Sequence, residues 1–329
     1  MNADGPGDTY ELINSVLAPQ GNVVEVPDCA HESYGRHISE EFDDELGIYV
    51  FRFDIHKDED NDRCKNFDRQ RNEIKTYDKS PDDLLGVLGE TVTYSWKFKL
   101  AEDFKPSSSF THLHQIKAVG GSEDAMPSIT LTARKGSPDN LELRFAEDFT
   151  QKTLVKFPLD AMRGKWLQVT SEVHYGDWGE GSYSVTITSI ADNTVVFEYE
   201  NNALRMWKTN ASFMRPKWGI YRSLNDQSSL QDESVFFADF MITEAGNTVL
   251  SSESQNSQIY PSAANDTIWL SDQFMVKYDQ VSIIDQNGRL LKTQKPTYHL
   301  DVSWLKPGLY LLRATHSDGK YEIFKFLKN

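Results

Sequence analysis

The stretch from Thr91 to Leu100 reads TVTYSWKFKL and carries an apolar residue at every second position. Side chains of a β-strand alternate between two faces, so this period of two residues is typical of a half-buried strand. Tyr49 to Phe53 shows the same alternation, and other short segments, broken by Gly, Pro, Asn and Asp, follow along the chain. These segments are residues 111–119, 128–133, 141–145, 166–175, 182–189, 194–199, 217–222 and 234–243. The pattern predicts an all-β sandwich of jelly-roll type.

Helical periodicity is limited to Thr9 to Leu17 and a turn near residues 158–162. Between Glu244 and Ala264 the alternation is lost among Ser, Asn, Gln and Gly, a composition that buries too little surface to fold alone. A second series of candidate strands follows, at residues 267–270, 280–285, 290–292, 298–301, 308–316 and 321–327. For a chain of 329 residues we therefore predict a β-jelly-roll domain (1–245), a linker (246–264) and a small C-terminal β-sandwich (265–329).

The formal net charge of −16 argues against nucleic acid as a partner, because no basic stripe offsets the acidic total. It does not exclude an anionic sugar, since a cleft can be locally positive on an acidic protein. No apolar run approaches the roughly 20 residues of a membrane helix, so we expect no transmembrane segment. The first residues, MNADGPGDTY, lack the basic and apolar regions of a secretory signal, and we expect no signal peptide within this sequence.

The two cysteines, Cys29 and Cys64, flank segments that read as adjacent strands. We predict that they form a disulfide across a loop, in an oxidising compartment, with two separate buried thiols as the alternative.

Three polar segments stand out from the strand pattern. On an extended segment 68–75, one face would carry Arg69, Arg71, Glu73 and Lys75. Four charged side chains cannot face a core, so they line either water or a cleft. An arginine next to a carboxylate is well suited to bind a sugar carboxylate through its planar donors. A solvated face of an edge strand is the alternative interpretation.

The second segment, residues 110–118, is polar on both faces, which is costly inside a sandwich unless the groups are hydrogen-bonded. Strict alternation assigns one face to Thr111, Leu113, Gln115 and Lys117, and the other to His112, His114 and Ile116. In the third segment, Lys217, Gly219 and Tyr221 would share a face opposite Trp218 and Ile220. The glycine either leaves room for a ligand or marks a bulge.

These segments resemble the motifs of jelly-roll polysaccharide lyases, whose fold is concanavalin-like. The matching residues are Arg71-Asn72-Glu73-Ile74, Gln115-Ile116-Lys117 and Lys217-Trp218-Gly219-Ile220-Tyr221. Lys117 stands where alginate and heparin lyases place a histidine. Over residues 28–243 the chain looks closest to the short ulvan lyases, with the glucuronan lyases next. The resemblance implies a secreted enzyme that cleaves an anionic polysaccharide beside glucuronate or iduronate by β-elimination.

The resemblance also implies roles for individual residues. Lys117 would be the base that takes the proton from C5, and Tyr221 the acid that protonates the departing oxygen on C4. Arg71 and Gln115 would neutralise the uronate carboxylate, with Glu73 orienting the arginine. In an alternative version Tyr221 acts as both base and acid, and Lys117 only binds the carboxylate.

Further groups are predicted to bind substrate along a positive groove. They are Arg69, Lys75, Lys217, Arg222, His37 and His114, although a structural role explains His114 equally well. Trp178, Tyr175 and Trp207 could stack on sugar rings, but core packing is the favoured interpretation for each. No cofactor is expected for catalysis. A structural calcium is predicted at Asp239, with a buried hydrogen-bonded aspartate as the alternative, while the acidic run 58–62 is interpreted as a solvated turn.

The final domain resembles the C-terminal sorting domains of the type IX secretion route of Bacteroidetes. The matching segments are residues 260–266, 281–288, 300–303, 305–310 and 325–328. This resemblance implies contact with outer-membrane secretion machinery and a secreted or cell-surface location. An ordinary accessory sandwich is the alternative.

Two other functions on the same fold stay open. Glu41, Asp43 and Glu45 have the Glu-x-Asp-x-Glu spacing of laminarinase-type glycoside hydrolases, although Asp44 is a poor core residue. A non-catalytic carbohydrate-binding protein would keep the positive groove without a proton donor and acceptor.

Overall fold

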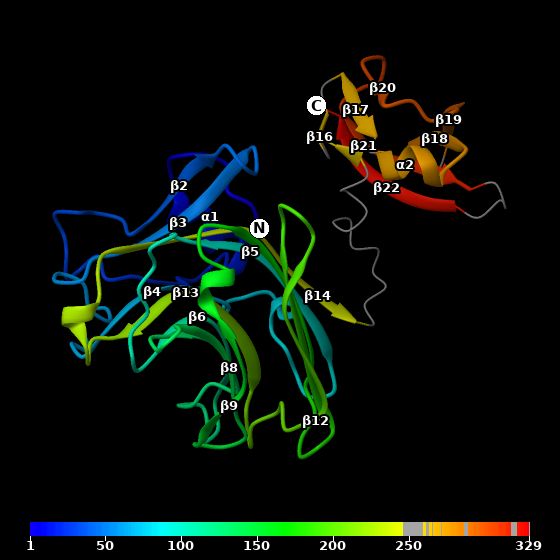
Figure 1. Cartoon of the computed structure of the whole chain (residues 1–329). Coiled ribbons are helices and arrows are strands. Elements are labelled where there is room, and N and C mark those ends of the chain that lie inside the picture. Colours follow the sequence, from blue (N-terminus) through cyan, green and yellow to red (C-terminus); the bar gives the residue numbers. More distant parts are fainter. Residues whose placement is uncertain are drawn as a thin grey trace. The chain divides into compact units, whose positions relative to one another are not determined.

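The computed structural model describes residues 1–245, 259–260, 263–264, 266–270, 272–285, 289–316 and 321–328. The chain divides into two compact units, Met1–Gly246 and Asn247–Asn329, which are described separately below (Figure 1). Within the described residues, no helix has the length and apolar character needed to cross a membrane.

The first unit is built from two seven-stranded antiparallel sheets (Figure 1). The first sheet has the strand order β1 (Val24–Glu25), β4 (Arg69–Lys75), β13 (Phe213–Ser223), β6 (Thr111–Val119), β7 (Ile129–Arg134), β8 (Asn140–Ala146) and β9 (Gln151–Pro158). The second has the order β12 (Val195–Leu204), β11 (Gly181–Ser189), β10 (Trp166–His174), β5 (Thr91–Leu100), β14 (Glu233–Ala245), β3 (Ile48–Ile55) and β2 (Ile38–Asp43). The predicted all-β jelly-roll sandwich is confirmed.

Strand β5 shows why these residues form this fold. It lies between β10 and β14, and its even-numbered residues are all buried while the odd-numbered ones are partly exposed. Val92, Tyr94, Trp96, Phe98 and Leu100 are each at most 2% exposed and belong to one continuous core. Burial of such large apolar side chains is the main favourable contribution to folding. The alternation in the sequence therefore reports the buried face directly.

Most predicted strands are present, and the exceptions have a physical reason. Helix α1 (Thr9–Leu17) and the short 3₁₀ turn η2 (Leu159–Ala161) occur where expected, while η1 (Asp82–Leu84) and η3 (Gln227–Ser229) are additional. Strands β1, β2 and β9 were not predicted from alternation. Strand β9 lies at a sheet edge and contains no fully buried residue, so it has no apolar period to detect.

The second unit has a three-stranded and a five-stranded sheet. The first has the order β15 (Ile259–Tyr260), β17 (Thr267–Leu270), β20 (His299–Asp301), and the second β16 (Ala263–Ala264), β22 (Tyr321–Lys328), β21 (Gly308–Thr315), β18 (Gln280–Asp285), β19 (Leu290–Gln294). Helix α2 (Asp272–Lys277) contributes Phe274 to a separate core with Leu312, Phe324 and Phe326. Most of the predicted linker, 246–264, lies outside the described residues, while 259–260 and 263–264 pair with strands of this unit.

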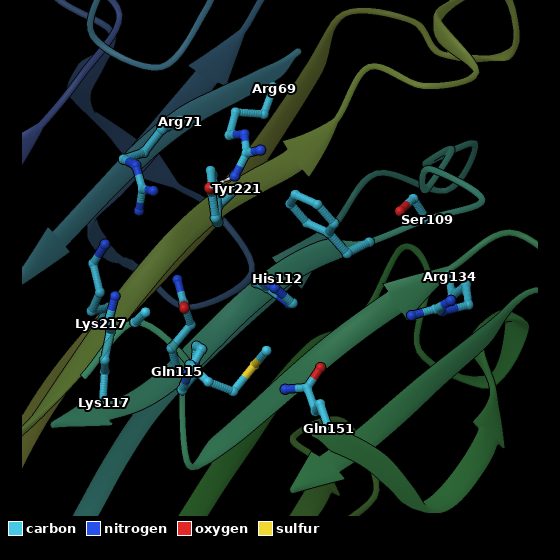
Figure 2. A pocket seen from close by; sticks show the side chains of 14 residues that line it. Arg69, Arg71, Ser109, His112, Gln115, Lys117, Arg134, Gln151, Lys217 and Tyr221 are labelled. Carbon is cyan, nitrogen blue, oxygen red and sulfur yellow. Dashed lines mark hydrogen bonds between the residues drawn. The ribbon is translucent and has the colours of Figure 1, made fainter. Parts of the chain in front are cut away.

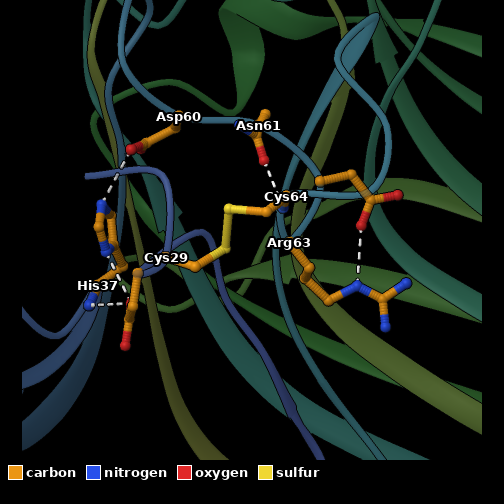
Figure 3. Close-up of a disulfide and its surroundings, with 8 residues drawn as sticks. Cys29, His37, Asp60, Asn61, Arg63 and Cys64 are labelled. Atoms are coloured by element: carbon orange, nitrogen blue, oxygen red, sulfur yellow. Dashed lines mark hydrogen bonds and ion pairs between the residues drawn. A yellow bond between two sulfur atoms is a disulfide. The ribbon is translucent and has the colours of Figure 1, made fainter. Parts of the chain in front are cut away.

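A disulfide joins Cys29 to Cys64, as predicted. It connects the loop after β1 to the loop before β4, and the Cα atoms of the two residues are 6.3 Å apart (Figure 3). The two cysteines are 35 residues apart in sequence, so the disulfide closes a long loop that contains β2 and β3.

Replacing both cysteines, Cys29→Ser with Cys64→Ser, should lower the free energy of unfolding by about 2–4 kcal/mol, because the open loop gains entropy in the unfolded chain. Urea denaturation followed by tryptophan fluorescence measures the change. Wild-type protein unfolded under a reducing agent serves as the matched control and should show the same loss. An unchanged unfolding midpoint in the double variant would show that the disulfide does not stabilise the fold.

Candidate active site

A pocket of about 340 Å³ opens on the face of the first sheet that points away from the core (Figure 2). Strands β4, β13, β6, β7 and β9 contribute to it, together with the segment before β6 and the loop between β6 and β7. The lining residues are Arg69, Arg71, Ser109, Phe110, His112, Gln115, Lys117, Ala125, Met126, Pro127, Arg134, Gln151, Lys217 and Tyr221. Five of them are arginine or lysine and none is a carboxylate, so the pocket suits an anionic ligand.

Beneath this lining lies Glu73, a fully buried carboxylate on β4. One of its oxygens accepts a hydrogen bond from Gln115 Nε2 at 2.5 Å. The other accepts from Arg71 Nη1 and, at 2.6 Å, from Lys217 Nζ. Burial by itself would raise the pKa of Glu73, but Lys217 and Arg71 outweigh it and lower this pKa below its ordinary value. Glu73 therefore stays charged and joins three strands of the first sheet.

A second carboxylate, Glu25 on β1, completes the ionic network. It lies 2.5 Å from Lys217 Nζ and 2.9 Å from Lys75 Nζ. Burial would raise the pKa of Glu25, yet Lys217, Lys75 and Arg71 together lower it far below the ordinary value. The ammonium group of Lys217 thus pairs with two carboxylates. The side chain also lines the pocket.

Arg71 is held from three directions. Its Nε donates to Asp62 Oδ1 at 2.9 Å, its Nη1 donates to Glu73, and its guanidinium lies 3.6 Å from the centroid of the Tyr221 ring. Arg69 donates to the Tyr221 hydroxyl oxygen at 3.0 Å. Burial raises the pKa of Tyr221, and Arg71 and Arg69 oppose that increase. The phenol therefore sits between two cations with its own proton free to point into the pocket.

Lys117 differs from the other cations of the pocket. In the part of the chain that the structure describes, its amine takes part in no hydrogen bond or ion pair, whereas Lys217 has two carboxylate partners. Burial lowers the pKa of Lys117 to about 8, and the positive charges of Lys217, Arg215 and Arg71 contribute in the same direction. A substantial fraction of this amine is neutral near pH 8, as a proton acceptor requires.

The alternation of residues predicted for β4 and β13 is correct, but in β6 it fails at one point. A register shift between His112 and His114 inserts Leu113 as an extra residue opposite β7. This β-bulge turns His112 to the same face as Gln115 and Lys117, where it lines the pocket. Burial lowers the pKa of His112 to about 3, so its imidazole is neutral, and its Nδ1 lies 2.8 Å from Thr132 Oγ1. Sequence reasoning assigned His112 to the opposite face.

Two residues predicted to bind substrate, His114 and Arg222, are buried away from the pocket. His114 is completely buried on the core side, with its ring centroid 4.4 Å from that of Trp96 and 5.6 Å from that of Trp218. Arg222 is also fully buried, and its Nε donates to Gln70 Oε1 at 2.8 Å. Neither residue lines the pocket. Both predictions of substrate contact are therefore wrong, and both side chains are structural.

His37 was predicted in the groove, which is also wrong. It is fully buried between Asp28 and Asp60 and does not line the pocket. The acidic run 58–62 is not simply a solvated turn, because Asp60 and Asp62 are at most 3% exposed. Asp62 pairs with Arg71. The run thus supplies one of the carboxylates that position the pocket arginine.

Other sequence candidates lie elsewhere. Asp239 forms an ion pair with Lys97 at 2.6 Å, and a calcium there stays a prediction. A Cβ atom on Gly219 would lie 2.1 Å from the backbone oxygen of Asn72, so close strand packing rather than a ligand requires this glycine. Tyr175 is a core residue, and neither Trp178 nor Trp207 lines the pocket.

The hydrolase-like spacing also lies away from the pocket. Glu41 and Asp43 belong to β2, an edge strand of the second sheet, and Glu45 follows it. Glu41 pairs with Arg52, Glu45 pairs with Lys99, and Asp43 accepts a hydrogen bond from the Trp166 indole. These contacts give the three carboxylates structural roles.

Residues 32–241 match the polysaccharide lyase family, and the chain belongs to this family. The match spans most of the jelly-roll unit, including every strand that contributes to the pocket. Residues 258–328 match the secretion system C-terminal sorting domain, which indicates export to the cell surface or beyond. No curated protein was found that matches this chain.

Solved alginate lyases are among the structures to which part of this chain is similar. Alginate lyase A1-II′ is 16% identical, with 68% of this chain and 93% of that chain covered and a TM-score of 0.46. The marine alginate lyase from Aplysia kurodai is 15% identical, covering 68% and 98% with a TM-score of 0.45. PA1167 from Pseudomonas aeruginosa is 13% identical, covering 68% and 97% with a TM-score of 0.44.

The substitution Glu73→Gln should lower the free energy of unfolding near pH 7 by about 3–5 kcal/mol, because Lys217 and Arg71 lose a buried partner. The folded state lowers the pKa of Glu73, so the stabilisation is present above the ordinary glutamate pKa and lost as the pH falls through the folded-state pKa. The difference between wild type and variant should therefore narrow in acid. Urea denaturation at several pH values measures it.

Glu198→Gln is the matched control, because Glu198 is an exposed carboxylate on β12. It should leave the unfolding curve unchanged at every pH. Equal stability of wild type and Glu73→Gln at pH 7 would show that the network contributes nothing to folding.

Proposed function

We propose that this polysaccharide lyase cleaves a uronate-containing anionic polysaccharide, with ulvan as the favoured substrate and glucuronan next. The observation that carries the proposal is Lys117, whose amine has no ionic partner among the described residues and whose pKa burial lowers to about 8, in the same pocket as Tyr221. In β-elimination a base removes the proton on C5, the bond from C4 to its oxygen breaks, and a double bond forms between C4 and C5. The pocket offers one group for each proton transfer.

The carboxylate of the uronate must be neutralised so that charge developing at C5 can spread into it. Gln115 directs one N–H to Glu73, and Lys217 pairs with Glu73 and Glu25; each keeps one further N–H, and both line the pocket. Arg71 adds a fixed positive charge, although Asp62 and Glu73 already occupy three of its donor positions. We therefore assign the direct carboxylate contacts to Gln115 and Lys217, with Arg71 acting through charge and through its stacking on Tyr221.

Lys117 is the proposed base, since burial and, in addition, neighbouring cations make its neutral form accessible. Tyr221 is the proposed acid. Its oxygen accepts a hydrogen bond from Arg69 and its ring lies on Arg71, contacts that stabilise the phenolate left after it donates its proton. The same two contacts also favour a second version, in which Tyr221 acts as both base and acid and Lys117 binds the carboxylate.

The preference for ulvan rests on two observations. The first is Lys117, which occupies the position where the alginate and heparin lyases resembled by the motifs have histidine. The second is the spread of positive charge, because Arg134 lies at the opposite end of the pocket from Lys117 (Figure 2). A chain with sulfate esters as well as uronate carboxylates would meet cations at both ends.

Incubation with ulvan, glucuronan, alginate and heparin should produce rising ultraviolet absorbance from unsaturated sugar ends, with the highest rate on ulvan. The absorbance arises because elimination, unlike hydrolysis, creates a double bond next to the carboxylate. New reducing ends without absorbance would instead identify a glycoside hydrolase. Binding to one of these polymers without any cleavage would identify a carbohydrate-binding protein.

The variant Lys117→Arg separates the two versions of the mechanism. Arginine keeps the positive charge but cannot be deprotonated, so loss of a general base should reduce kcat/KM by roughly 100- to 10,000-fold. Wild-type kcat/KM should rise with pH through about 8, as the Lys117 amine becomes neutral, and the residual activity of the variant should lack this limb. Tyr221→Phe should abolish activity in both versions, as should Lys117→Met in the first.

Lys165→Arg provides the control, because Lys165 is exposed and lies outside the pocket. It should retain wild-type kinetics. Near-normal kcat in Lys117→Arg, with only KM altered, would remove Lys117 as the base and leave Tyr221 with both proton transfers.

A further inference from the structure

Outside the pocket, three histidines converge on one buried aspartate. His31 and His37 lie on the segment between β1 and β2, His56 follows β3, and Asp60 lies four residues further on. One potential ligand atom from each residue lies within 4.8 Å of the others. Among the described residues, these four side chains form the cluster of metal-binding residue types that is close enough to hold one ion. None of the four residues lines the pocket of the proposed reaction. Figure 3 shows His37 and Asp60 beside the disulfide.

The distances match those of a metal centre. Asp60 Oδ1 lies 3.0 Å from His37 Nε2 and 3.5 Å from His31 Nδ1, and Asp60 Oδ2 lies 3.2 Å from His56 Nδ1. Ligand atoms at about 2.0–2.1 Å from a tetrahedral zinc ion are separated by about 3.3 Å. All four ligand atoms lie within 4.8 Å of one another, so the ligands would move closer by up to about 1.5 Å to surround one ion.

Burial leaves one ligand atom without an ordinary partner. His37 and Asp60 are completely buried at the side chain, and His31 and His56 are less than one-fifth exposed. His31 Nδ1 is buried and makes no hydrogen bond, although it faces Asp60. An unsatisfied buried nitrogen costs free energy, and coordination of a cation removes that cost.

The surrounding groups are those that orient metal-binding histidines. His37 Nδ1 lies 2.8 Å from Asp28 Oδ1, which leaves Nε2 as the atom that faces Asp60. Asp28 in turn accepts hydrogen bonds from the Tyr10 hydroxyl at 3.0 and 3.1 Å. The ring of Tyr34 packs on His37 and His56, with centroids 4.8 and 4.2 Å away. His37 and His56 are thus each held by a neighbouring side chain.

From this geometry we propose that His31, His37, His56 and Asp60 bind one zinc ion. Three imidazole nitrogens and one carboxylate suit zinc rather than calcium, which prefers six to eight oxygen ligands. Four protein ligands fill a tetrahedral shell, so the ion is structural and leaves no position for substrate.

The site is connected to the pocket through one short loop. Asp60 and Asp62 lie on the same segment, and Asp62 binds Arg71, which stacks on Tyr221. The backbone oxygen of Asp60 accepts a hydrogen bond from Gln70, the residue before Arg71. A zinc ion on Asp60 would therefore fix the loop that positions the pocket arginine, and the Cys29–Cys64 disulfide ties down the same loop.

A proton is the competing occupant. Without an ion, burial would lower the pKa of His37, but its hydrogen bonds to Asp28 and Asp60 raise that pKa to about 9. His37 would then carry the positive charge that the carboxylates require, and the cluster would need no metal. Metal content distinguishes the two occupants directly.

The full chain, purified without chelator from zinc-supplemented medium, should contain about one zinc ion per molecule by inductively coupled plasma mass spectrometry. His31→Gln and His56→Gln should lose that zinc, while Asp28→Asn should weaken zinc binding by roughly 10- to 100-fold. His299→Gln, an exposed histidine of the second unit, is the matched control and should retain the ion. Chelation of wild-type protein should lower its Tm, and added zinc should restore it.

Cobalt(II) added to the metal-free wild type provides a readout that does not depend on variant folding. A tetrahedral site of nitrogen and oxygen ligands should give intense visible absorption bands, which stoichiometric zinc abolishes and excess calcium does not. Circular dichroism checks that the variants are folded. Wild-type protein that contains no more zinc than His56→Gln, and binds neither cobalt nor zinc in titrations, would overturn the proposal in favour of the proton. This outcome would leave the lyase proposal unaffected.

Discussion

The buried carboxylate of Glu73 is the constraint on which the pocket depends. It accepts hydrogen bonds from β4, β6 and β13, the three adjacent strands that supply the proposed reacting groups. A charge without partners in this position would be strongly unfavourable, and Lys217 and Arg71 lower the pKa of Glu73 against the effect of burial. Glu73 in turn holds each of these three side chains in one orientation through a hydrogen bond. The pocket is thus arranged before any substrate arrives, which is the condition for electrostatic stabilisation of a transition state.

The same strands build both the core and the site because their residues alternate between two faces. Trp218 packs with Trp96 in the interior, while its neighbour Lys217 joins the ionic network outside. Packing against a rigid hydrophobic core limits the movement of the strand and hence of the charged residue beside it. This arrangement explains why a site made of long, flexible side chains can be well ordered. Within the part of the chain that the structure describes, Lys117 has no ionic partner, whereas Tyr221 contacts Arg69 and Arg71.

The sequence predicts those features that depend on local periodicity. Strand β5, helix α1 and the shared face of Arg69, Arg71 and Glu73 follow from residue spacing alone. Features that depend on distant partners could not be obtained in this way. The bulge at Leu113, which brings His112 into the pocket, arises from the pairing of β6 with its neighbours. The acidic run 58–62 resembles a solvated turn until Arg71 and three histidines are placed around it. His114 and Arg222 suggest function because polar residues inside a sandwich are unusual, yet both side chains are fully buried away from the pocket.

The five cations of the pocket lie in a chain whose formal charge is −16, and this contrast would affect how the proposed polyanionic substrate arrives and leaves. Outside the cleft, the acidic surface repels the polymer, and the repulsion extends over about 10 Å at 0.1 M ionic strength. Added salt would therefore reduce the range of this repulsion more than it weakens the buried ion pairs, because buried charges are less accessible to solvent ions. Capture favours a chain that presents a segment directly to the cleft, and a cleaved fragment that has moved a short way out is driven further away. For the proposed anionic substrate, the acidic exterior would therefore aid turnover, because it would restrict where the polymer contacts the protein and would help products leave the surface.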